Sequence, residues 1–371
     1  MKTGIGYSIK RAAAMLAAVC MLGSAAGCGS TSGGGDTAPN NDTAAQTAQT
    51  ESGGDAEGET AEADSKITYP VTVKVGYSTN EEDPRGVVLK KFKETVEKET
   101  NGDVIIEIHP SGELGSDSDL IKGLIDGSVD MTVSSAGNYA AYATKIGVSA
   151  LPFLFSDFES AWKFLDSSTM RNIEPDLEEY NIHVLSYFDN GFRCVTTSAN
   201  VGPVKSVEDM NGLNIRTPDN QIVMETMSAL KANPRSYPFA DLKAALEDGT
   251  FDAQENPIPV IYNNKLYDVQ KYLSITNHSY DAMPLTIRND LWNDLKPEYQ
   301  DTILAAAKTA SYENRSLVKE QTQEFVSKLE EAGMEVNYPD LEPFKEATSR
   351  VIDFFADTYG QELIDEVKKN V

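Results

Sequence analysis

The sequence predicts an α/β fold with two lobes. Strand-like and helix-like segments alternate after residue 70, and the alternation resumes after residue 210. About 300 residues follow the polar N-terminal region, which is more than one core usually holds. The first five elements run strand, helix, strand, helix, strand, an order that predicts a parallel sheet covered by helices: Val71–Tyr77, Pro84–Thr100, Val104–His109, Asp117–Asp126 and Val129–Val133.

Residues 1–27 have the pattern of an export signal. Three basic residues near the start precede an apolar run over residues 12–22, and small residues follow at 23–27. The run is too short to span a bilayer, so we predict a cleaved signal peptide. The segment Ala25-Ala26-Gly27-Cys28 resembles the lipobox of bacterial lipoproteins, which implies lipidation of Cys28. The alternative is an ordinary secretory signal with an incidental cysteine.

Residues 28–65 predict a disordered tether. From Gly29 to Asp64 there is no aromatic and no large aliphatic side chain. Such a chain cannot bury enough apolar surface to offset the entropy of ordering it. Together with a lipid on Cys28, it would hold the folded region at the outer face of the bacterial cell membrane.

Charge and cysteine content limit the partners and the covalent framework. The formal net charge is -26, which disfavours nucleic acid and anionic lipid surfaces as partners. Cys194 is the one cysteine after the tether, so no internal disulfide is expected. No cofactor or metal motif occurs, and we expect a monomer.

The second half continues the α/β pattern and ends in helices. Asp189-Asn190-Gly191 reads as a turn between two strands. A run from Pro297 to Glu331 predicts a helix long enough to lie across both lobes. We predict one lobe at 66–190 plus about 282–320, and the other at 191–281 plus about 321–371. The remaining predicted elements are strands Val184–Tyr187, Phe192–Thr197, Arg235–Tyr237, Phe251–Gln254, Tyr272–Thr276 and Met283–Arg288, and helices Asn220–Leu230, Ala240–Glu247, 342–358 and 361–369.

Arg216 is the leading candidate for anion binding. Asn211-Gly212 predicts a turn, a short strand follows, and Pro218 ends it, so Arg216 lies where the strand passes into a loop. A guanidinium keeps its charge and grips a carboxylate through two parallel hydrogen bonds. Ligands of parallel sheets bind beyond the carboxyl ends of strands, which places Ser78 and Ser135 at the same cleft.

Five motifs, in order, resemble the extracytoplasmic solute-binding proteins of tripartite ATP-independent periplasmic (TRAP) transporters, the DctP family. The resemblance covers the chain from about Val71 to its C-terminus. Its motifs are Ser111-Gly-Glu-Leu-Gly115 with Leu120 to Asp130, Leu151-Pro-Phe-Leu-Phe155, Asn190-Gly-Phe-Arg193, Gly212-Leu-Asn-Ile-Arg216-Thr-Pro218, and Pro238-Phe-Ala240 with Leu246 to Pro257.

The resemblance implies a periplasmic-binding-protein-like fold whose two lobes close on an organic acid. It assigns Arg216 to the ligand carboxylate, Arg193 to a second cationic contact, Asn256 to an amide contact and Phe239 to an apolar wall. A structural salt bridge is the alternative for Arg193. Further candidates at cleft-facing positions are Tyr237, Asp219, Ser78 and Ser135. C4-dicarboxylates, uronates and other hydroxy acids all remain open as ligands.

The resemblance also implies delivery of the acid to small and large membrane subunits of a sodium-coupled permease. Another binding module, serving an ABC importer or a sensor kinase, is the first alternative. An enzyme is the second. Arg193 precedes Cys194, and a neighbouring cation lowers a thiol pKa, but no histidine is placed by sequence to act with that thiol. We therefore expect no catalysis.

Overall fold

The computed structural model describes residues 67–370, which form a mixed α/β fold. The predicted export signal, lipidated Cys28 and tether lie outside the described residues. One sheet of nine strands runs through the described part of the chain. The strands are β1 Val71–Gly76, β2 Val104–His109, β3 Met131–Val133, β4 Ile182–Thr197, β5 Asn214–Thr217, β6 Asn233–Ser236, β7 Ala253–Pro257, β8 Tyr272–Arg288 and β9 Glu335–Asn337.

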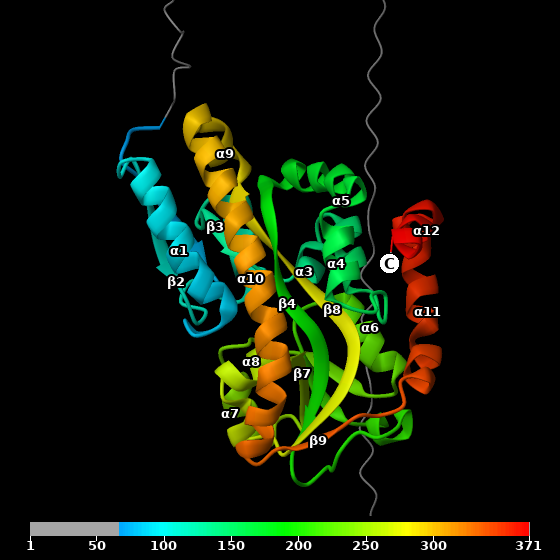
Figure 1. The fold of residues 1–371 in the computed structure, drawn as a ribbon. Coiled ribbons are helices and arrows are strands. Elements are labelled where there is room, and N and C mark those ends of the chain that lie inside the picture. Colours follow the sequence, from blue (N-terminus) through cyan, green and yellow to red (C-terminus); the bar gives the residue numbers. More distant parts are fainter. Residues whose placement is uncertain (1–66, 371) are drawn as a thin grey trace, which may run out of the picture. The chain divides into compact units, whose positions relative to one another are not determined.

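The sheet has two parallel halves joined by a long antiparallel ribbon. The strand order is β2-β1-β3-β8-β4-β7-β5-β6, with β9 paired to β8. Strands β2, β1 and β3 are mutually parallel, as are β7, β5 and β6. Strands β4 and β8 are antiparallel to each other and to the strands beside them in this order, and they run side by side through the sheet (Figure 1). We call the β2-β1-β3 half the first lobe and the β7-β5-β6 half the second lobe.

The predicted turn at residues 189–191 and the predicted division of residues 272–288 into two strands are wrong, because β4 and β8 are each continuous. The segment Asp189-Asn190-Gly191 does not turn; it lies within β4, and the register to β8 shifts between Asp189 and Gly191. Gly191 has φ 108°, a conformation that absorbs the extra residue as a bulge. The predicted strands Tyr272–Thr276 and Met283–Arg288 are likewise the two ends of β8. The ribbon therefore passes from one lobe to the other without a break.

Capping residues in the sequence set the ends of several helices. Asp83 caps α1 and a proline follows it, while Ser116 and Asp119 form a capping box on α2, which ends at Gly127. The α-helices are α1 Pro84–Glu99, α2 Asp117–Asp126, α3 Ala136–Tyr139, α4 Phe158–Leu165, α5 Ser168–Ile173, α6 Gln221–Ala229, α7 Leu242–Glu247, α8 Ile258–Asn263, α9 Asn289–Asp294, α10 Pro297–Glu331, α11 Glu342–Tyr359 and α12 Gln361–Asn370. Short 3-10 helices are η1 Thr144–Ala150, η2 Glu174–Tyr180, η3 Val207–Met210 and η4 Leu266–Asp268.

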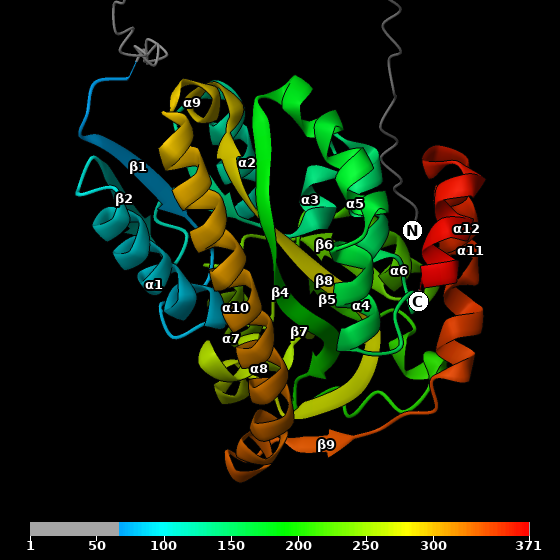
Figure 2. The same cartoon turned by 45° about the horizontal axis from the view of Figure 1, so that its top comes forward.

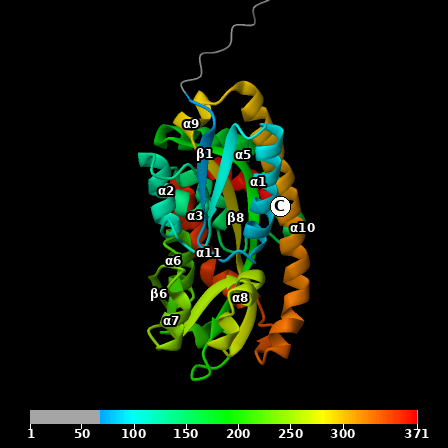
Figure 3. The ribbon, with the colours of Figure 1, turned by 90° about the vertical axis from the view of Figure 1, so that its left-hand side faces the viewer.

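Helix α10 spans both lobes, as predicted. Its 35 residues correspond to about 52 Å at 1.5 Å per residue. It packs on α1 in the first lobe, on β4 along the ribbon, and on α8 in the second lobe (Figure 3). Buried residues along one face of the helix, from Ile303 to Leu329, join the cores of the two lobes.

The C-terminal helices pack across the boundary between the lobes. Helix α11 contacts α6 of the second lobe and η1, and α12 contacts α4 and α5 (Figure 2). Val351, Phe355 and Val367 are buried in the same core cluster as Phe164. The residue boundaries that we predict for the lobes remain a prediction.

Among residues 67–370, no helix combines the length and the apolar character that crossing a membrane requires. The same residues contain no cluster of histidine, cysteine and acidic side chains suited to a metal ion.

Candidate functional site

Two adjoining cavities lie between the lobes. The inner cavity has a volume of about 350 Å³ and the outer cavity about 560 Å³, both including space open to solvent. Asp117, Arg216, Pro218 and Phe239 line both. Six of the eight predicted site residues line the inner cavity: Ser78, Ser135, Arg193, Arg216, Phe239 and Asn256. The other two, Asp219 and Tyr237, line the outer cavity.

The ends of parallel strands position these side chains. Ser78 follows β1 and Ser135 follows β3 in the first lobe, while Arg216 and Asn256 lie near the carboxyl ends of β5 and β7 in the second lobe. The carboxyl ends of parallel strands are the usual place for ligands in open α/β sheets. Strand β4 contributes Arg193, opposite Ser279 of β8.

Arg216 carries a buried charge that forms no ion pair with a carboxylate within the described residues, although Glu255 and Asp117 act on it through space. Its side chain is 3% exposed. The Nε atom donates to the backbone oxygen of Tyr237 at 2.8 Å, and the guanidinium lies 5.7 Å from the centre of the Phe239 ring. Burial lowers the pKa of the Arg216 guanidinium to about 10. It is still protonated at neutral pH, so the cavity contains a desolvated cation.

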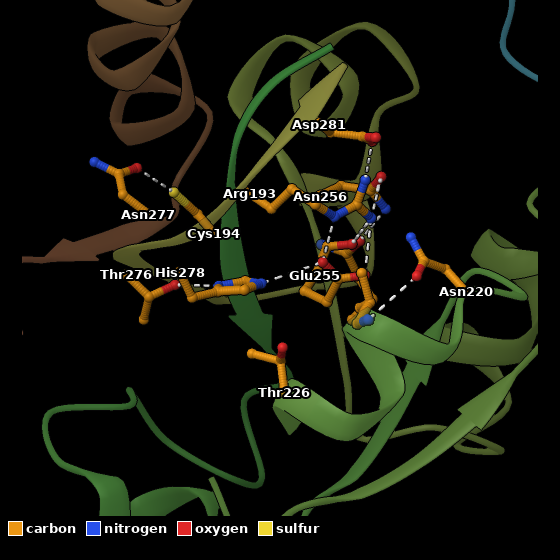
Figure 4. A network of polar contacts seen from close by, with 12 residues as sticks. Arg193, Cys194, Asn220, Thr226, Glu255, Asn256, Thr276, Asn277, His278 and Asp281 are labelled. Carbon is orange, nitrogen blue, oxygen red and sulfur yellow. Dashed lines mark hydrogen bonds and ion pairs between the residues drawn. The ribbon is translucent and has the colours of Figure 1, made fainter. Parts of the chain in front are cut away.

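Arg193 is also buried, but two carboxylates balance its charge. Figure 4 shows its guanidinium between Glu255 and Asp281. Nε and Nη2 donate to the Glu255 carboxylate, the latter at 2.8 Å, and Nη1 donates to Asp281 Oδ2 at 2.5 Å. Burial acts to lower the pKa of Arg193, but the two carboxylates outweigh it and raise that pKa. Nη2 also reaches Asn256 Oδ1 at 3.3 Å, so the predicted amide contact is attached to this network.

Behind Glu255 the network continues through His278. This histidine is fully buried, its Nδ1 lies 2.8 Å from Thr276 Oγ1, and its Nε2 lies 3.3 Å from Glu255 Oε2. Cys194 is buried beside Asn277. Burial raises the pKa of the Cys194 thiol to about 11 and outweighs the lowering by the adjacent Arg193, so the thiol is not activated.

Four charged or amide side chains that line the inner cavity were not predicted from the sequence: Arg85, Asp117, Asn190 and Asp281. The Arg85 side chain bonds Asp83 Oδ1 at 2.8 Å through Nε and Asn190 Oδ1 at 2.9 Å through Nη2. Asn190 in turn donates to Asp281 Oδ2 at 2.8 Å. The sequence did offer a signal for Arg85. It lies at the start of the helix after β1, seven positions after the predicted cleft residue Ser78. Asp281 had none, because its partners are far away in sequence.

Asp117 begins α2 and lines both cavities. Ser78 Oγ donates to its Oδ2 at 3.3 Å, whereas its Oδ1 has no hydrogen-bond partner within the described residues. Burial raises the pKa of the Asp117 carboxyl, and the charge of Arg85 opposes this rise.

Hydrogen bonds between the lobes flank the cavities. Ser118 Oγ of α2 donates to Asp219 Oδ2 at 2.9 Å, so one carboxylate oxygen of this predicted ligand contact bonds the opposite lobe. Asn80 Nδ2 donates to the backbone oxygen of Asn263 at 2.8 Å. Tyr237 is 36% exposed and its ring packs against Phe251.

The family model described as "Bacterial extracellular solute-binding protein, family 7" (DctP) matches residues 75–358, well over half of the chain. The chain belongs to this family. The 2,3-diketo-L-gulonate-binding periplasmic protein of Escherichia coli is 33% identical over 300 residues, covering 81% of this chain and 88% of that relative. The C4-dicarboxylate-binding periplasmic protein of Rhodobacter capsulatus is 28% identical over 308 residues, covering 81% and 91%.

Solved structures of TRAP periplasmic solute-binding proteins share the fold of this DctP-family member. The protein from Polaromonas sp. JS666, bound to D-erythronate, superposes with a TM-score of 0.77 at 30% identity, covering 80% of this chain and 98% of that chain. The sugar acid binding protein from Advenella mimigardefordensis, in complex with galactonate, superposes with a TM-score of 0.78 at 28% identity. The match covers 82% of this chain and 98% of that chain. The two-lobed fold and the solute-binding class predicted from the sequence are confirmed.

Proposed function

We propose that this protein binds an organic acid, a C4-dicarboxylate or a sugar acid such as a uronate, through a salt bridge between the ligand carboxylate and Arg216. The observation that carries the proposal is the buried guanidinium of Arg216, which has no carboxylate partner among residues 67–370. A desolvated charge is costly unless an opposite charge meets it. A ligand carboxylate supplies that charge in a bidentate geometry.

Two further observations support an acid as the ligand. Relatives are named for binding 2,3-diketo-L-gulonate and C4-dicarboxylates, and the compared structures hold D-erythronate and galactonate. The cavities combine Arg216 with the Phe239 ring and several uncharged polar side chains. This mixture suits a small polar anion with an apolar edge.

The remaining steps are proposed from the family. The receptor, anchored through lipid on Cys28, delivers the acid to the small and large membrane subunits of a TRAP permease and performs no catalytic step. Finding genes for those subunits next to the gene for this protein would support that partner. A neighbouring gene for a sensor kinase or an ABC importer would contradict it. Ligand stabilises the closed form only by binding it more tightly than the open form.

Thermal unfolding of the full chain against dicarboxylates, uronates, aldonates and keto acids tests the proposal. Bound ligand is first removed by unfolding and refolding. An acid at a hundred times its dissociation constant adds about 2.7 kcal/mol and raises the midpoint. Arg216→Ala should weaken binding of that acid by about 2 to 5 kcal/mol, because it removes a buried charge partner. Arg216→Lys should lose less, since charge remains without the planar fork.

The matched control is Arg350→Ala, which removes an exposed arginine on α11. It should leave affinity unchanged. Unchanged affinity in Arg216→Ala, measured by calorimetry, would show that the carboxylate binds elsewhere.

A further inference from the structure

The two cavities contain three guanidinium groups, and only one lacks a carboxylate partner. Arg85 pairs with Asp83 at 2.8 Å, and Arg193 pairs with both Glu255 and Asp281. Arg216 forms no ion pair within residues 67–370. The cavities therefore have one cation available to an anionic ligand, although the sequence analysis expected two.

A second carboxylate on the ligand would lie among like charges. Besides the three arginines, the charged side chains lining the two cavities are the acids Asp117, Asp219 and Asp281, of which Asp281 pairs with Arg193. Two lysines line neighbouring hollows, but Lys122 is exposed and Lys243 pairs with Asp268 at 2.6 Å. A buried carboxylate without a cation disfavours the bound state strongly. The charge arrangement thus disfavours a dianion.

Unpaired oxygen atoms in the cavities call for hydrogen-bond donors. Thr79 Oγ1, Asp117 Oδ1 and Asn138 Oδ1 are buried and have no hydrogen-bond partner in the described part of the chain. Thr79 lines the inner cavity, Asn138 the outer cavity, and Asp117 both. A carboxylate oxygen and an amide oxygen accept hydrogen bonds and donate none. Ligand hydroxyl groups would donate to the Asp117 and Asn138 oxygens, whereas ionised ligand carboxylates would not.

We propose that the ligand is a monocarboxylic acid with several hydroxyl groups, an aldonate-like polyhydroxy acid, and that Asp117 selects it over dicarboxylates. This proposal rests on the proposed function, since Arg216 holds the one carboxylate. Asp117 accepts a hydrogen bond from a ligand hydroxyl, and its charge repels a second carboxylate at the same place. Among the acid classes left open by the sequence, this choice excludes C4-dicarboxylates.

Matched acids test the proposal by calorimetry on the full chain freed of bound ligand. Aldonates of four to six carbons are compared with the aldarates and the unsubstituted fatty acids of the same length, with succinate and malate added. We expect the best aldonate to bind at least about tenfold more tightly than its aldarate and its fatty acid. Arg216→Ala should abolish that binding.

Asp117→Asn tests the selecting residue, because it keeps the size of the side chain and removes its charge. We expect aldonate affinity to fall about tenfold and aldarate affinity to rise, so that their ratio shrinks. Asp126→Asn, the same change at the exposed far end of α2, should leave the ratio unchanged.

The outcomes separate the two proposals. A dicarboxylate that binds as tightly as any aldonate, and loses binding in Arg216→Ala, overturns the ligand class and keeps the proposed function. An unchanged ratio in Asp117→Asn overturns the role of that residue. If no acid binds, or if Arg216→Ala binds normally, the proposed function fails and this inference fails with it.

Discussion

Arg193 and Arg216 lie in the same cavity, but their charges have different surroundings. Glu255 neutralises Arg193 from a position with no exposed surface, and His278 lies behind it. Such a pair is costly to break, because either partner alone is a buried charge. The Arg193 cluster therefore holds the ribbon strands β4 and β8 to β7 of the second lobe at the cavity, while Arg216 remains available for an incoming anion.

Replacing Glu255 with glutamine should destabilise the protein by about 3 to 5 kcal/mol, because Arg193 loses its bidentate partner in a buried place. Urea unfolding measures the loss. Glu313→Gln, which breaks the exposed pair with Lys91 at 2.7 Å, is the control and should cost less than about 1 kcal/mol. Similar losses in the two variants would mean that the buried pair contributes no more than a surface one.

Asp189 gives the stability a pH dependence. Its carboxylate accepts hydrogen bonds from Tyr280 and, at 2.6 Å, from Trp162 Nε1, yet burial raises the pKa of the Asp189 carboxyl to about 6. An unfolded aspartate has a pKa of about 3.9, so the folded protein holds the proton more tightly. The resulting stabilisation is fully present below about pH 4 and disappears as pH rises through about 6.

Asp189→Asn should remove this dependence. Relative to the variant, the unchanged protein should lose about 2 kcal/mol of unfolding free energy between about pH 4 and pH 7. Urea midpoints across that range measure it. Asp353→Asn, an exposed change on α11, should keep the original profile. If the unfolding free energy of Asp189→Asn changed with pH in the same way as that of the unchanged protein, another group would be responsible for the pH dependence.

At the scale of elements, the sequence predicted individual helices and strands better than the long β4–β8 ribbon that connects the two lobes. Helices α2 and α10 have their predicted bounds, because caps and apolar spacing are local signals. The ribbon was missed, because Asn190-Gly191 is a strong turn signal that β4 uses as a bulge. The candidate site shows the same division. Arg216 was predicted from local signals at the end of a short strand. The pairing of Arg193 with Asp281 joins residues 88 positions apart, so no local signal could predict it.

The bulge at Gly191 has a consequence for the site. Asn190 and Arg193 are three positions apart and would face opposite sides of a regular strand, but both line the inner cavity. An added residue in the bulge brings them to one side. Gly191→Ala places a side chain at φ 108° with its Cβ 3.2 Å from Val318.

We expect Gly191→Ala to cost about 1 to 3 kcal/mol of stability and to weaken acid binding as well. Urea unfolding and calorimetry measure the two effects. Gly102→Ala also has a positive φ, at 81°, but no neighbouring atom would contact its Cβ and it lies far along the chain from the cavity. It should cost stability without changing affinity. If Gly191→Ala lowered the stability but left the affinity unchanged, the bulge would not be needed for the shape of the site.

At the scale of the whole molecule, the two lobes approach closely beside the cavities. Gly137 of α3, in the first lobe, lies against Asn220, which caps α6 of the second lobe. A Cβ at Gly137 would lie 1.8 Å from Asn220 Nδ2, nearer than atoms can pack. The φ of Gly137 is not positive, so an alanine there is tolerated by the backbone and conflicts only with the opposite lobe.

Gly137→Ala should therefore leave each lobe folded and hold the lobes apart. Small-angle scattering with saturating acid should show a larger radius of gyration than for the unchanged protein, and affinity should fall about tenfold or more, because the closed form costs more to reach. The double variant Gly137→Ala, Asn220→Ala removes the opposing amide and should recover much of the affinity, although Asn220→Ala alone loses the cap of α6. Equal affinity in Gly137→Ala and the unchanged protein would mean that the acid binds without closure at this contact, and that Arg216 alone determines affinity.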